Sequence, residues 1–534
     1  MSRSAWSTQR IRDLLKISRS LYEKQNNVVT IAATGSGKTL SFWIPLLMAL
    51  EDKQDKFIIV VTPLNILGRQ NAETLTAAGI SAVSDIEAGK HQVVVINPEI
   101  LMREGGHCEK LWKKSAFTSR LLYFVFDEGH CVSEWSSFWE QYKYVGNLRF
   151  LIPDTIPFYI ASTTLLSPVL SDITDSLNLQ SKCTDHIFRS NDRPDIAISV
   201  RKMQHAVNTF KDFNALILDN FQEGDPPSLK FLIFFDSIKE AEVAVRHLRS
   251  RLPDTLRSKI KYFHSIMSDD YRNDEYEALK NSDIFGLCVT DSFGMGLDLP
   301  DVRLVVQWKV PISMNMLWQR FGRAARGDGI EGYAILIAEK AHWDDELEKR
   351  EHRKAQRQAN AKKRKRKTTT MQKRPAKQAR TGDVQASHSS VVIVPDEPNQ
   401  NSSSDTALNL EARRSLYAKR ANRGIGAVGK ELKVLSPTML DFTNAESRGF
   451  QCRRMPITLL YSNDQRVMKR SAIKAYIPGD TESELRTRLL NWRDEQMEKK
   501  FGRALFMNYG SGLLLPETSI QRVIDCAQAG KLRT

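Results

Sequence analysis

At 534 residues the chain is long enough for about three domains, and its 41% hydrophobic and 26% charged residues are typical of globular proteins. Its apolar runs are shorter than a membrane span and its charged N-terminus does not resemble a secretory signal, so we expect no membrane partner. Its six cysteines form no CxxC pair, which favours a reducing compartment and argues against a disulfide framework.

The first 340 residues alternate short apolar runs with helix-length segments. Runs that predict buried strands lie at 28–33, 57–63, 93–98, 121–128 and 158–163. The pattern restarts after residue 229, with runs at 231–237, 285–291, 302–308 and 332–338. Continuous apolar strands that alternate with helices are typical of parallel sheets covered on both faces. We therefore predict an α/β fold with two tandem parallel-sheet domains, at residues 1–178 and 179–344.

The composition changes from residue 345 onward. Residues 350–380 hold 14 lysines and arginines against one acid, so this block carries +13 of the formal +15 and the rest is nearly neutral. The polar segment 395–405 cannot bury enough surface to fold, and 345–406 is predicted to be a basic low-complexity linker. Apolar residues recur at helical spacing within 482–502, which indicates a small, mostly helical C-terminal domain at 407–534.

The run KKRKRK at 362–367 is typical of a nuclear localisation signal, so we expect the protein in the nucleus. A non-specific DNA tether is a compatible second role, since neutralised phosphates release counterions. A solvated charge run without a partner is the remaining interpretation.

The segment AATGSGKT, at 32–39, lies between a predicted strand and a predicted helix, as a phosphate-binding loop requires. Glycines let backbone N–H groups wrap a phosphate at the helix N-terminus. Lys38 would reach the β- and γ-phosphates, and the Thr39 hydroxyl would ligate Mg²⁺. The alternative is a glycine-rich turn that binds nothing. The predicted nucleotide-binding residues of this loop are Thr34, Gly35, Ser36, Gly37, Lys38 and Thr39.

The stretch LLYFVFDEGHCVSEW, at 121–135, runs an apolar strand into two adjacent acids. Asp127 would hold a metal, usually through a water, and Glu128 would polarise the water that attacks the γ-phosphate. On their own, two acids at a strand end are better explained as a solvated turn. The phosphate loop upstream shifts the interpretation to a metal site, with ATP and Mg²⁺ as cofactors.

The motifs between residues 28 and 340 together resemble those of superfamily 2 helicases, and within that class the eukaryotic RecQ-type DNA helicases of the DExH kind. In chain order they are AATGSGKT, TPLNILGRQ (62–70), NPEILM (97–102), DEGHCVSEW (127–135), ASTT (161–164), FFDS (234–237), TDSFGMGLDLPDV (290–302) and QRFGRAAR (319–326). The resemblance implies two RecA-like domains and an ATP-dependent helicase with 3′→5′ polarity in DNA repair or recombination. Single-stranded and partly duplex DNA are the implied partners.

The resemblance also implies how the second domain would act on ATP bound to the first. Arg323 and Arg326 would stabilise the γ-phosphate, because guanidinium stays charged and presents a planar fork of donors. Gln319 would lie between the domains. Asp298, on the loop after Gly296, would accept hydrogen bonds from the ribose.

DNA contacts follow from the same resemblance. The implied strand-binding residues are Thr62, Asn65, Asn97, Ser237 and Thr290, with Trp135 stacking on bases. For Trp135 the alternative is core packing, and for Phe138 and Trp139 stacking and core packing are equally open. His130 would couple DNA binding to the ATP site. Ser162 and Thr163 would join the two sites, unless backbone groups satisfy their hydroxyls.

Three departures from the family pattern stand out. CRRMPITLLYSND, at 452–464, resembles the opening of the RecQ zinc-binding segment, but no further cysteine comes before Cys526. Structural zinc requires four ligands, so we expect no zinc. Ala325 replaces the glycine that is usual in this family. Leu15 lies at a position where the family has a residue that reads adenine, which suggests that the first domain is truncated. A DNA-stimulated translocase without efficient unwinding and an inactive nucleic-acid-binding scaffold therefore stay open as alternatives.

Overall fold

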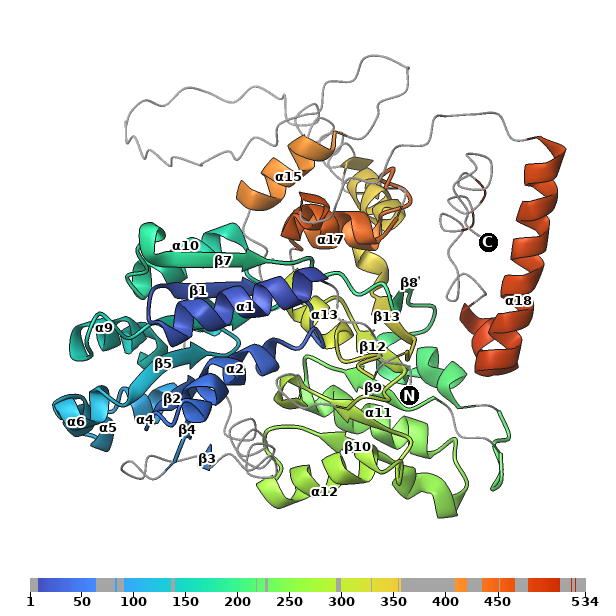
Figure 1. The fold of residues 1–534 in the computed structure, drawn as a ribbon. Helices are drawn as coiled ribbons and strands as arrows, with labels where there is room; N and C mark the ends of the chain where they lie inside the picture. Colours follow the sequence, from blue (N-terminus) through green and yellow to red (C-terminus); the bar gives the residue numbers. More distant parts are fainter. Residues whose placement is uncertain are drawn as a thin grey trace, which may run out of the picture.

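Two parallel β-sheets form the body of the molecule (Figure 1). The structure is a computed structural model. It describes residues 8–63, 82–83, 91–135, 140–217, 219–225, 229–293, 299–327, 329–353, 355–356, 409–419, 435–450, 452–465, 479–509, 520 and 524.

The first sheet has seven strands in the order β3-β4-β2-β5-β6-β1-β7, and every neighbouring pair is parallel. Its central strands are buried along their whole length, because apolar side chains point to both covered faces. The strands are β1 (Asn27–Ile31), β2 (Phe57–Val61), β3 (Ala82–Val83), β4 (Val93–Ile96), β5 (Leu121–Phe126), β6 (Phe158–Ser162) and β7 (Thr184–Phe188).

Helices cover both faces of this sheet. One face packs against α1 (Thr8–Tyr22) and α2 (Lys38–Glu51). The other packs against a series of short helices, α4 (Pro98–Leu101), α5 (His107–Trp112), α6 (Ser115–Thr118), α7 (Cys131–Glu134), α8 (Glu140–Tyr144), α9 (Leu148–Leu151) and α10 (Ser167–Ser176). Two 3₁₀ turns, η1 (Val145–Asn147) and η2 (Ser181–Cys183), complete the domain.

The second sheet has six parallel strands in the order β10-β11-β9-β12-β13-β8. They are β8 (Ile196–Lys202), β9 (Phe231–Phe234), β10 (Ile260–Phe263), β11 (Gly286–Val289), β12 (Leu304–Trp308) and β13 (Gly332–Ala338). One face packs against α11 (Ile238–Arg249) and η4 (Lys211–Leu216), and the other against α12 (Asp269–Lys280) and α13 (Met314–Phe321). The remaining 3₁₀ turns are η3 (Val207–Thr209), η5 (Asp254–Lys259), η6 (Asp291–Phe293) and η7 (Lys340–His342).

The predicted fold class, two tandem parallel-sheet domains, is confirmed. The first sheet extends past residue 178, the expected domain limit, because β7 pairs with β1 in register Asn27 to Thr184. The chain passes to the second sheet between Phe188 and Ile196. Most of the predicted linker, 357–406, lies outside the described residues.

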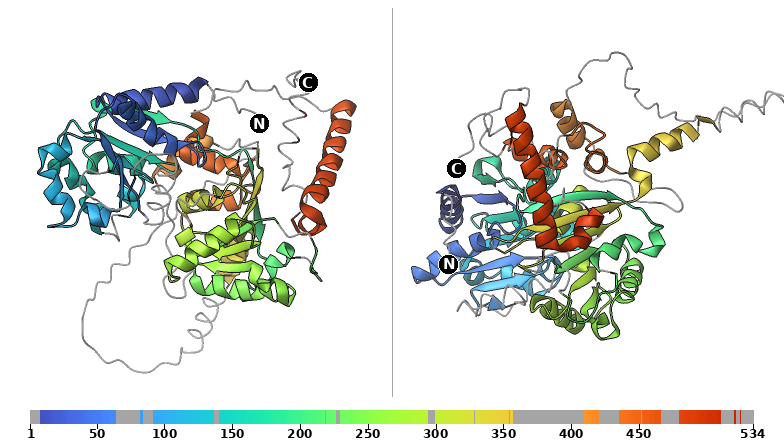
Figure 2. Two further views of the ribbon diagram at one scale, coloured as in Figure 1. Left: turned by 60° about the horizontal axis from the view of Figure 1, so that its bottom comes forward. Right: turned by 90° about the vertical axis from the view of Figure 1, so that its right-hand side faces the viewer.

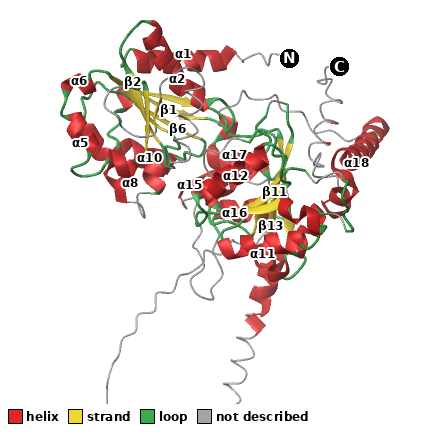
Figure 3. Ribbon diagram, turned by 90° about the horizontal axis from the view of Figure 1, so that it is seen from below, coloured by secondary structure: helices red, strands yellow, loops and turns green. Residues whose placement is uncertain are grey.

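The C-terminal helices divide into two groups (Figures 2 and 3). The first lies beside the junction of the two sheets and comprises α15 (Leu410–Lys419), α16 (Pro437–Thr443), α17 (Arg454–Tyr461) and the turn η8 (Asn463–Gln465). The 30-residue α18 (Asp480–Tyr509) lies apart from them and meets η4 of the second domain. None of the helices in the described part of the chain combines the length and apolar character needed to cross a bilayer.

Candidate active site at the junction of the two domains

The segment between β1 and α2 forms a turn with two glycines at positive φ, Gly35 at 77° and Gly37 at 81°. A Cβ at Gly35 would meet no atom within 4 Å, so the backbone conformation and not the space around it requires glycine. Gly37 caps α2, and the first N–H groups of that helix have no helical partner. This geometry suits an anion at the mouth of the loop.

Lys38 is held at the base of the loop. Its ammonium donates to the carbonyls of Ala32 at 2.8 Å and Ala33 at 2.9 Å, and to Thr163 Oγ1 at 3.0 Å. Thr163 Oγ1 also lies 3.5 Å from Thr34 Oγ1. The structure thus joins the phosphate loop to the segment after β6, while a connection from Thr163 to the DNA site stays a prediction.

Charges from both domains meet at Lys38. Desolvation of its ammonium lowers the pKa of Lys38 to about 8, while the carboxylates of Glu128 and Asp127 oppose that shift. Arg326 and Arg193 lower the pKa of Lys38 further. Both arginines donate to the carbonyl of Gly322, where an added Cβ would be 3.1 Å from Thr34 Oγ1 of the phosphate loop. Arg326 belongs to the second domain, so the two domains approach each other at this point.

Two acids follow β5 and face the same place. Burial and the neighbouring charge of Glu128 raise the pKa of Asp127 to about 7, and Asp127 Oδ1 accepts from the Glu128 N–H at 3.0 Å. Glu128 has φ 50°, and its buried Oε2 accepts no hydrogen bond from the described residues. Two desolvated carboxylates are costly unless a cation joins them. With the exposed Thr39 hydroxyl at the start of α2, they fit a Mg²⁺ that also binds nucleotide phosphates.

One face of α13 contacts the first domain directly. Gln319 Nε2 donates to His130 Nε2 at 3.0 Å and to Thr164 Oγ1 at 3.1 Å. His130 Nδ1 then donates to Ser162 Oγ at 3.0 Å and lies 3.5 Å from Glu128 Oε2. The structure therefore brings Gln319, His130 and Ser162 together beside the predicted catalytic acid.

The end of α13 lies against the phosphate loop. A Cβ at Gly322 would be 3.1 Å from Thr34 Oγ1. Arg326 Nε donates to the Gly322 carbonyl at 3.3 Å, and Arg323, 5% exposed, follows Gly322 in the same turn. Both predicted arginines are therefore carried by the part of the second domain that is nearest to the nucleotide loop.

Arg193, which the sequence analysis did not select, stabilises this turn. It lies in the connection between the sheets and donates to the carbonyls of Gly322 at 3.3 Å, Ala324 at 3.0 Å and Ala325 at 2.6 Å. Its guanidinium also pairs with Asp195 at 2.6 Å. Ala325 has φ 52°, the left-handed conformation that explains why the family has glycine there.

Arg320 is a second residue that the sequence analysis missed. It is 1% exposed and pairs with Asp236 at 2.7 Å and Asp291 at 2.6 Å, with Gln307 Oε1 at 2.7 Å. Burial lowers the pKa of Arg320, but the charges of Asp291 and Asp236 outweigh it and raise the pKa. Asp236 and Asp291 lie in the segments FFDS and TDSFG, so Arg320 holds three predicted motifs of the second domain together. The position of Arg320 within the motif QRFGRAAR could have identified it from the sequence.

The comparisons with known proteins agree with this geometry. The family described as DEAD/DEAH box helicase matches residues 15–173, and the helicase conserved C-terminal domain matches residues 215–328. The bifunctional 3′-5′ exonuclease/ATP-dependent helicase WRN of Mus musculus is 28% identical over 338 residues, 60% of this chain and 22% of that protein. The ATP-dependent DNA helicase RecQ of Bacillus subtilis is 25% identical over 338 residues, 60% of this chain and 52% of that protein. The chain belongs to the DEAD/DEAH box helicases, and it resembles the RecQ-type helicases among them.

The fold of this helicase chain is also found in a solved structure. The DUF1998 helicase MrfA bound to DNA superposes with a TM-score of 0.50 at 18% identity, over 62% of this chain and 47% of that one. The matched region covers only about a fifth to a half of the relatives named above. The matches therefore show the two helicase domains and their fold.

The predicted DNA-contacting residues of this helicase chain lie in several environments. The side chains of Asn97 and Ser237 accept hydrogen bonds from backbone N–H groups and cap α4 and α11. Thr62 is only 2% exposed, so its hydroxyl does not reach the surface here. Thr290 Oγ1 lies 3.2 Å from Ser292 Oγ. Direct DNA contact stays a prediction for these four residues.

Trp135 follows α7, and its partly buried ring packs edge-on against Tyr142, with centroids 5.8 Å apart. This agrees with the core-packing interpretation and still leaves part of the ring at the surface. The other aromatic, loop and ribose-binding candidates lie outside the described residues, namely Asn65, Phe138, Trp139, Gly296 and Asp298.

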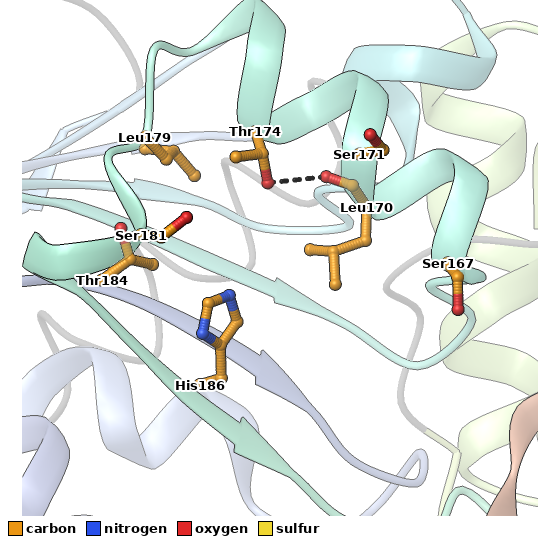
Figure 4. Close-up of a pocket in the computed structure, with 8 residues that line it drawn as sticks. All are labelled: Ser167, Leu170, Ser171, Thr174, Leu179, Ser181, Thr184 and His186. Atoms are coloured by element: carbon orange, nitrogen blue, oxygen red, sulfur yellow. Dashed lines mark hydrogen bonds between the residues drawn. The ribbon is translucent and has the colours of Figure 1, made fainter.

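A cavity of about 260 Å³ runs along α10 (Figure 4). Its lining contains none of the predicted site residues and consists of Ser167, Leu170, Ser171, Thr174, Leu179, Ser181, Thr184 and His186. Burial lowers the pKa of His186, so the lining has no charged group to attract a nucleotide at neutral pH. This cavity of the helicase fold is separate from the nucleotide loop.

Proposed function

We propose that this chain is an ATP-dependent DNA helicase, which couples ATP hydrolysis to 3′→5′ movement on single-stranded DNA and to separation of duplex DNA. One observation carries the proposal. The phosphate loop that bears Lys38 lies against the turn of the second domain that bears Arg323 and Arg326, where a Cβ at Gly322 would be 3.1 Å from Thr34 Oγ1.

In this proposal the nucleotide is bound between the domains. The glycine loop and Lys38 bind its phosphates, and Thr39 and Asp127 hold Mg²⁺, which neutralises the phosphate charge. Glu128 orients the attacking water, because its Oε2 is buried and accepts no hydrogen bond from the described residues. Arg323 and Arg326 stabilise the charge that develops on the γ-phosphate in the transition state.

Movement would follow from the split site. With ATP present, the arginines draw the second domain toward the first, and after hydrolysis that attraction weakens. Gln319 contacts His130 and Thr164, so closure would displace the segment after β6 and the DExH segment that carries the predicted DNA-sensing Trp135. We place this activity in the nucleus, in DNA repair or recombination.

A test combines two assays on the purified chain. ATP hydrolysis is measured with and without single-stranded DNA, and strand separation is measured on duplexes with a 3′ or a 5′ tail. The proposal predicts DNA-stimulated hydrolysis and separation of the 3′-tailed duplex alone. No hydrolysis under any condition would exclude the enzyme and leave the nucleic-acid-binding scaffold.

A second candidate is a DNA-stimulated translocase that separates strands poorly. It is favoured by the segment that resembles the start of a zinc-binding region. Cys452 Sγ there accepts from the Arg454 N–H at 3.4 Å, and the described residues contain no group of three or more His, Cys, Asp or Glu that could bind a metal. Stimulated hydrolysis without strand separation would select this function. Absence of zinc stays a prediction, which metal analysis of the purified chain would check.

A further inference from the structure

The C-terminal helices α16 and α17 are part of the core of the second domain. Met439, Phe442, Ile457 and Tyr461 belong to the same buried cluster as Met314, Leu317 and Trp318 of α13. A helix that shares a core with α13 moves with α13 when the domains close, because close-packed interiors transmit displacement.

Ion pairs and hydrogen bonds fix these helices in place. Arg454 pairs with Asp192 and donates to the carbonyls of Arg193 and Ile196, in the connection between the two sheets. Arg448 pairs with Asp344 at 2.6 Å. The helices are thus attached both to the second domain and to the connection that precedes it.

One chain of hydrogen bonds leads from α17 into the first domain. Tyr461, 2% exposed, donates from its hydroxyl to Asn315 Oδ1 at 2.6 Å. Asn315 Nδ2 donates to Glu134 Oε1 at 2.7 Å. A side-chain amide carries its acceptor oxygen and its donor nitrogen on opposite sides. The hydrogen bond from Tyr461 to Asn315 Oδ1 therefore also orients Asn315 Nδ2 toward Glu134. Glu134 ends α7, six residues after the predicted catalytic acid.

A second chain starts at Asn463, just after α17. Its amide exchanges two hydrogen bonds with Asn191, at 2.8 and 3.0 Å. Asn191 is fully buried, donates to the Thr163 carbonyl at 2.9 Å and accepts from Trp318 Nε1 at 3.1 Å. The Thr163 hydroxyl accepts from Lys38. The second chain therefore reaches the residue that contacts Lys38, and the first reaches α7, which follows the acids Asp127 and Glu128.

Asn315 and Gln319 lie one turn apart on the same face of α13. Gln319 contacts His130 and Asn315 contacts Glu134, so this face meets α7 at both ends. If the Asn315 amide rotates, α13 loses one of these contacts and the turn with Arg323 and Arg326 is less well fixed. A displacement of about 1 Å at a catalytic group can slow a reaction strongly.

We propose that Tyr461 is a positioning residue for ATP hydrolysis, which acts by holding Asn315 against Glu134 so that α13 presents its arginines to the nucleotide. This inference rests on the proposed ATPase function. It assigns the C-terminal helices a role in catalysis that depends on neither zinc nor DNA contact.

The test compares two Tyr→Phe substitutions in the same helical unit. Tyr461→Phe removes the hydroxyl that reaches Asn315, whereas Tyr417→Phe removes an equally buried hydroxyl that donates to Asp441 within the C-terminal helices. We expect Tyr461→Phe to lower the DNA-stimulated kcat about three- to tenfold, the size of one lost hydrogen bond, with unchanged affinity for a fluorescent ADP analogue. Tyr417→Phe should leave kcat unchanged. Equal effects of both substitutions would overturn the proposal.

A double-mutant cycle adds specificity. Glu134→Gln combined with Tyr461→Phe should be no slower than the slower single variant, because both changes affect one chain of contacts. If the double variant lowered kcat by the product of the two single effects, the proposed connection between Tyr461 and Glu134 would be contradicted.

Hydrogen exchange gives a readout that is independent of activity. Amides of residues 131–134 should exchange faster in Tyr461→Phe than in the wild type or in Tyr417→Phe. If the wild type shows no ATPase activity, the proposed function is wrong. If the wild type is active but Tyr461→Phe changes neither hydrogen exchange nor kcat, only the inference about Tyr461 is wrong.

Discussion

Gln319 donates to His130 at 3.0 Å, and this hydrogen bond crosses from the second RecA-like domain to the DExH segment of the first. His130 in turn lies 3.5 Å from Glu128 Oε2. The position of the second domain is therefore connected to the predicted water-orienting acid through a single side chain. We therefore expect nucleotide chemistry and domain closure to be coupled.

The first prediction separates binding from turnover. Glu128→Gln keeps the size of the side chain and removes the charge that would polarise water, so kcat should fall at least about a hundredfold while nucleotide affinity is kept. Lys38→Ala should instead weaken affinity for a fluorescent nucleotide. Normal turnover in Glu128→Gln would remove Glu128 from its assigned role.

The second prediction concerns pH. Asp127, with a pKa of about 7, must be ionised to hold Mg²⁺, so affinity for Mg²⁺–ADP should fall as the pH drops through 7. Lys38, with a pKa of about 8, must be protonated to bind phosphate, so affinity should also fall as the pH rises through 8. The profile should therefore be bell-shaped, and omission of Mg²⁺ should remove the acidic limb. If the affinity for Mg²⁺–ADP stayed constant from below pH 7 to above pH 8, the roles assigned to Asp127 and Lys38 would be contradicted.

The third prediction concerns Ala325, whose φ of 52° is strained for a residue with a Cβ. Ala325→Gly relieves that strain and should raise the free energy of unfolding by up to about 1 kcal/mol, after the entropy cost of glycine. The matched control is the buried neighbour Ala324, which has no positive φ, so Ala324→Gly should destabilise. Thermal unfolding of both variants checks this. If Ala325→Gly and Ala324→Gly lowered the stability equally, the strain at Ala325 would be refuted.

The fourth prediction concerns Gly129, which follows the two acids at the end of β5. A Cβ there would overlap Ile160 Cγ2 on β6, while the Gly129 N–H donates to Ala161 at 2.8 Å. Gly129→Ala should therefore destabilise by about 1–3 kcal/mol. Ile160→Ala makes room, so the two substitutions together should cost less than the sum of their single effects in chemical denaturation. Strict additivity would show that the steric contact is unimportant.

The sequence predicted the interior of both sheets but not their edges. Central strands such as β5 are continuous apolar runs because both faces are covered. The four strands that were not predicted, β3, β7, β8 and β10, are the outermost strands of the two sheets. Edge strands keep polar residues exposed, as in TDHIF of β7, so they lack that signal.

The same distinction applies to the site. The phosphate loop and the acids Asp127 and Glu128 could be predicted because their residue types are contiguous and follow buried strands. Arg193, Asn191 and Asn315 were missed because their partners lie far away in sequence, 272 residues in the case of Asn191 and Asn463. No local pattern encodes such a contact.

The most direct test of the account is the ATPase rate of Arg326→Ala beside the wild type, with single-stranded DNA present and fluorescent-nucleotide affinity measured in parallel. The account predicts a loss of about a thousandfold in turnover with affinity nearly kept, because Arg326 would act on the charge of the transition state. Wild-type turnover in Arg326→Ala would show that the nucleotide is hydrolysed without the second domain, and would contradict the central claim.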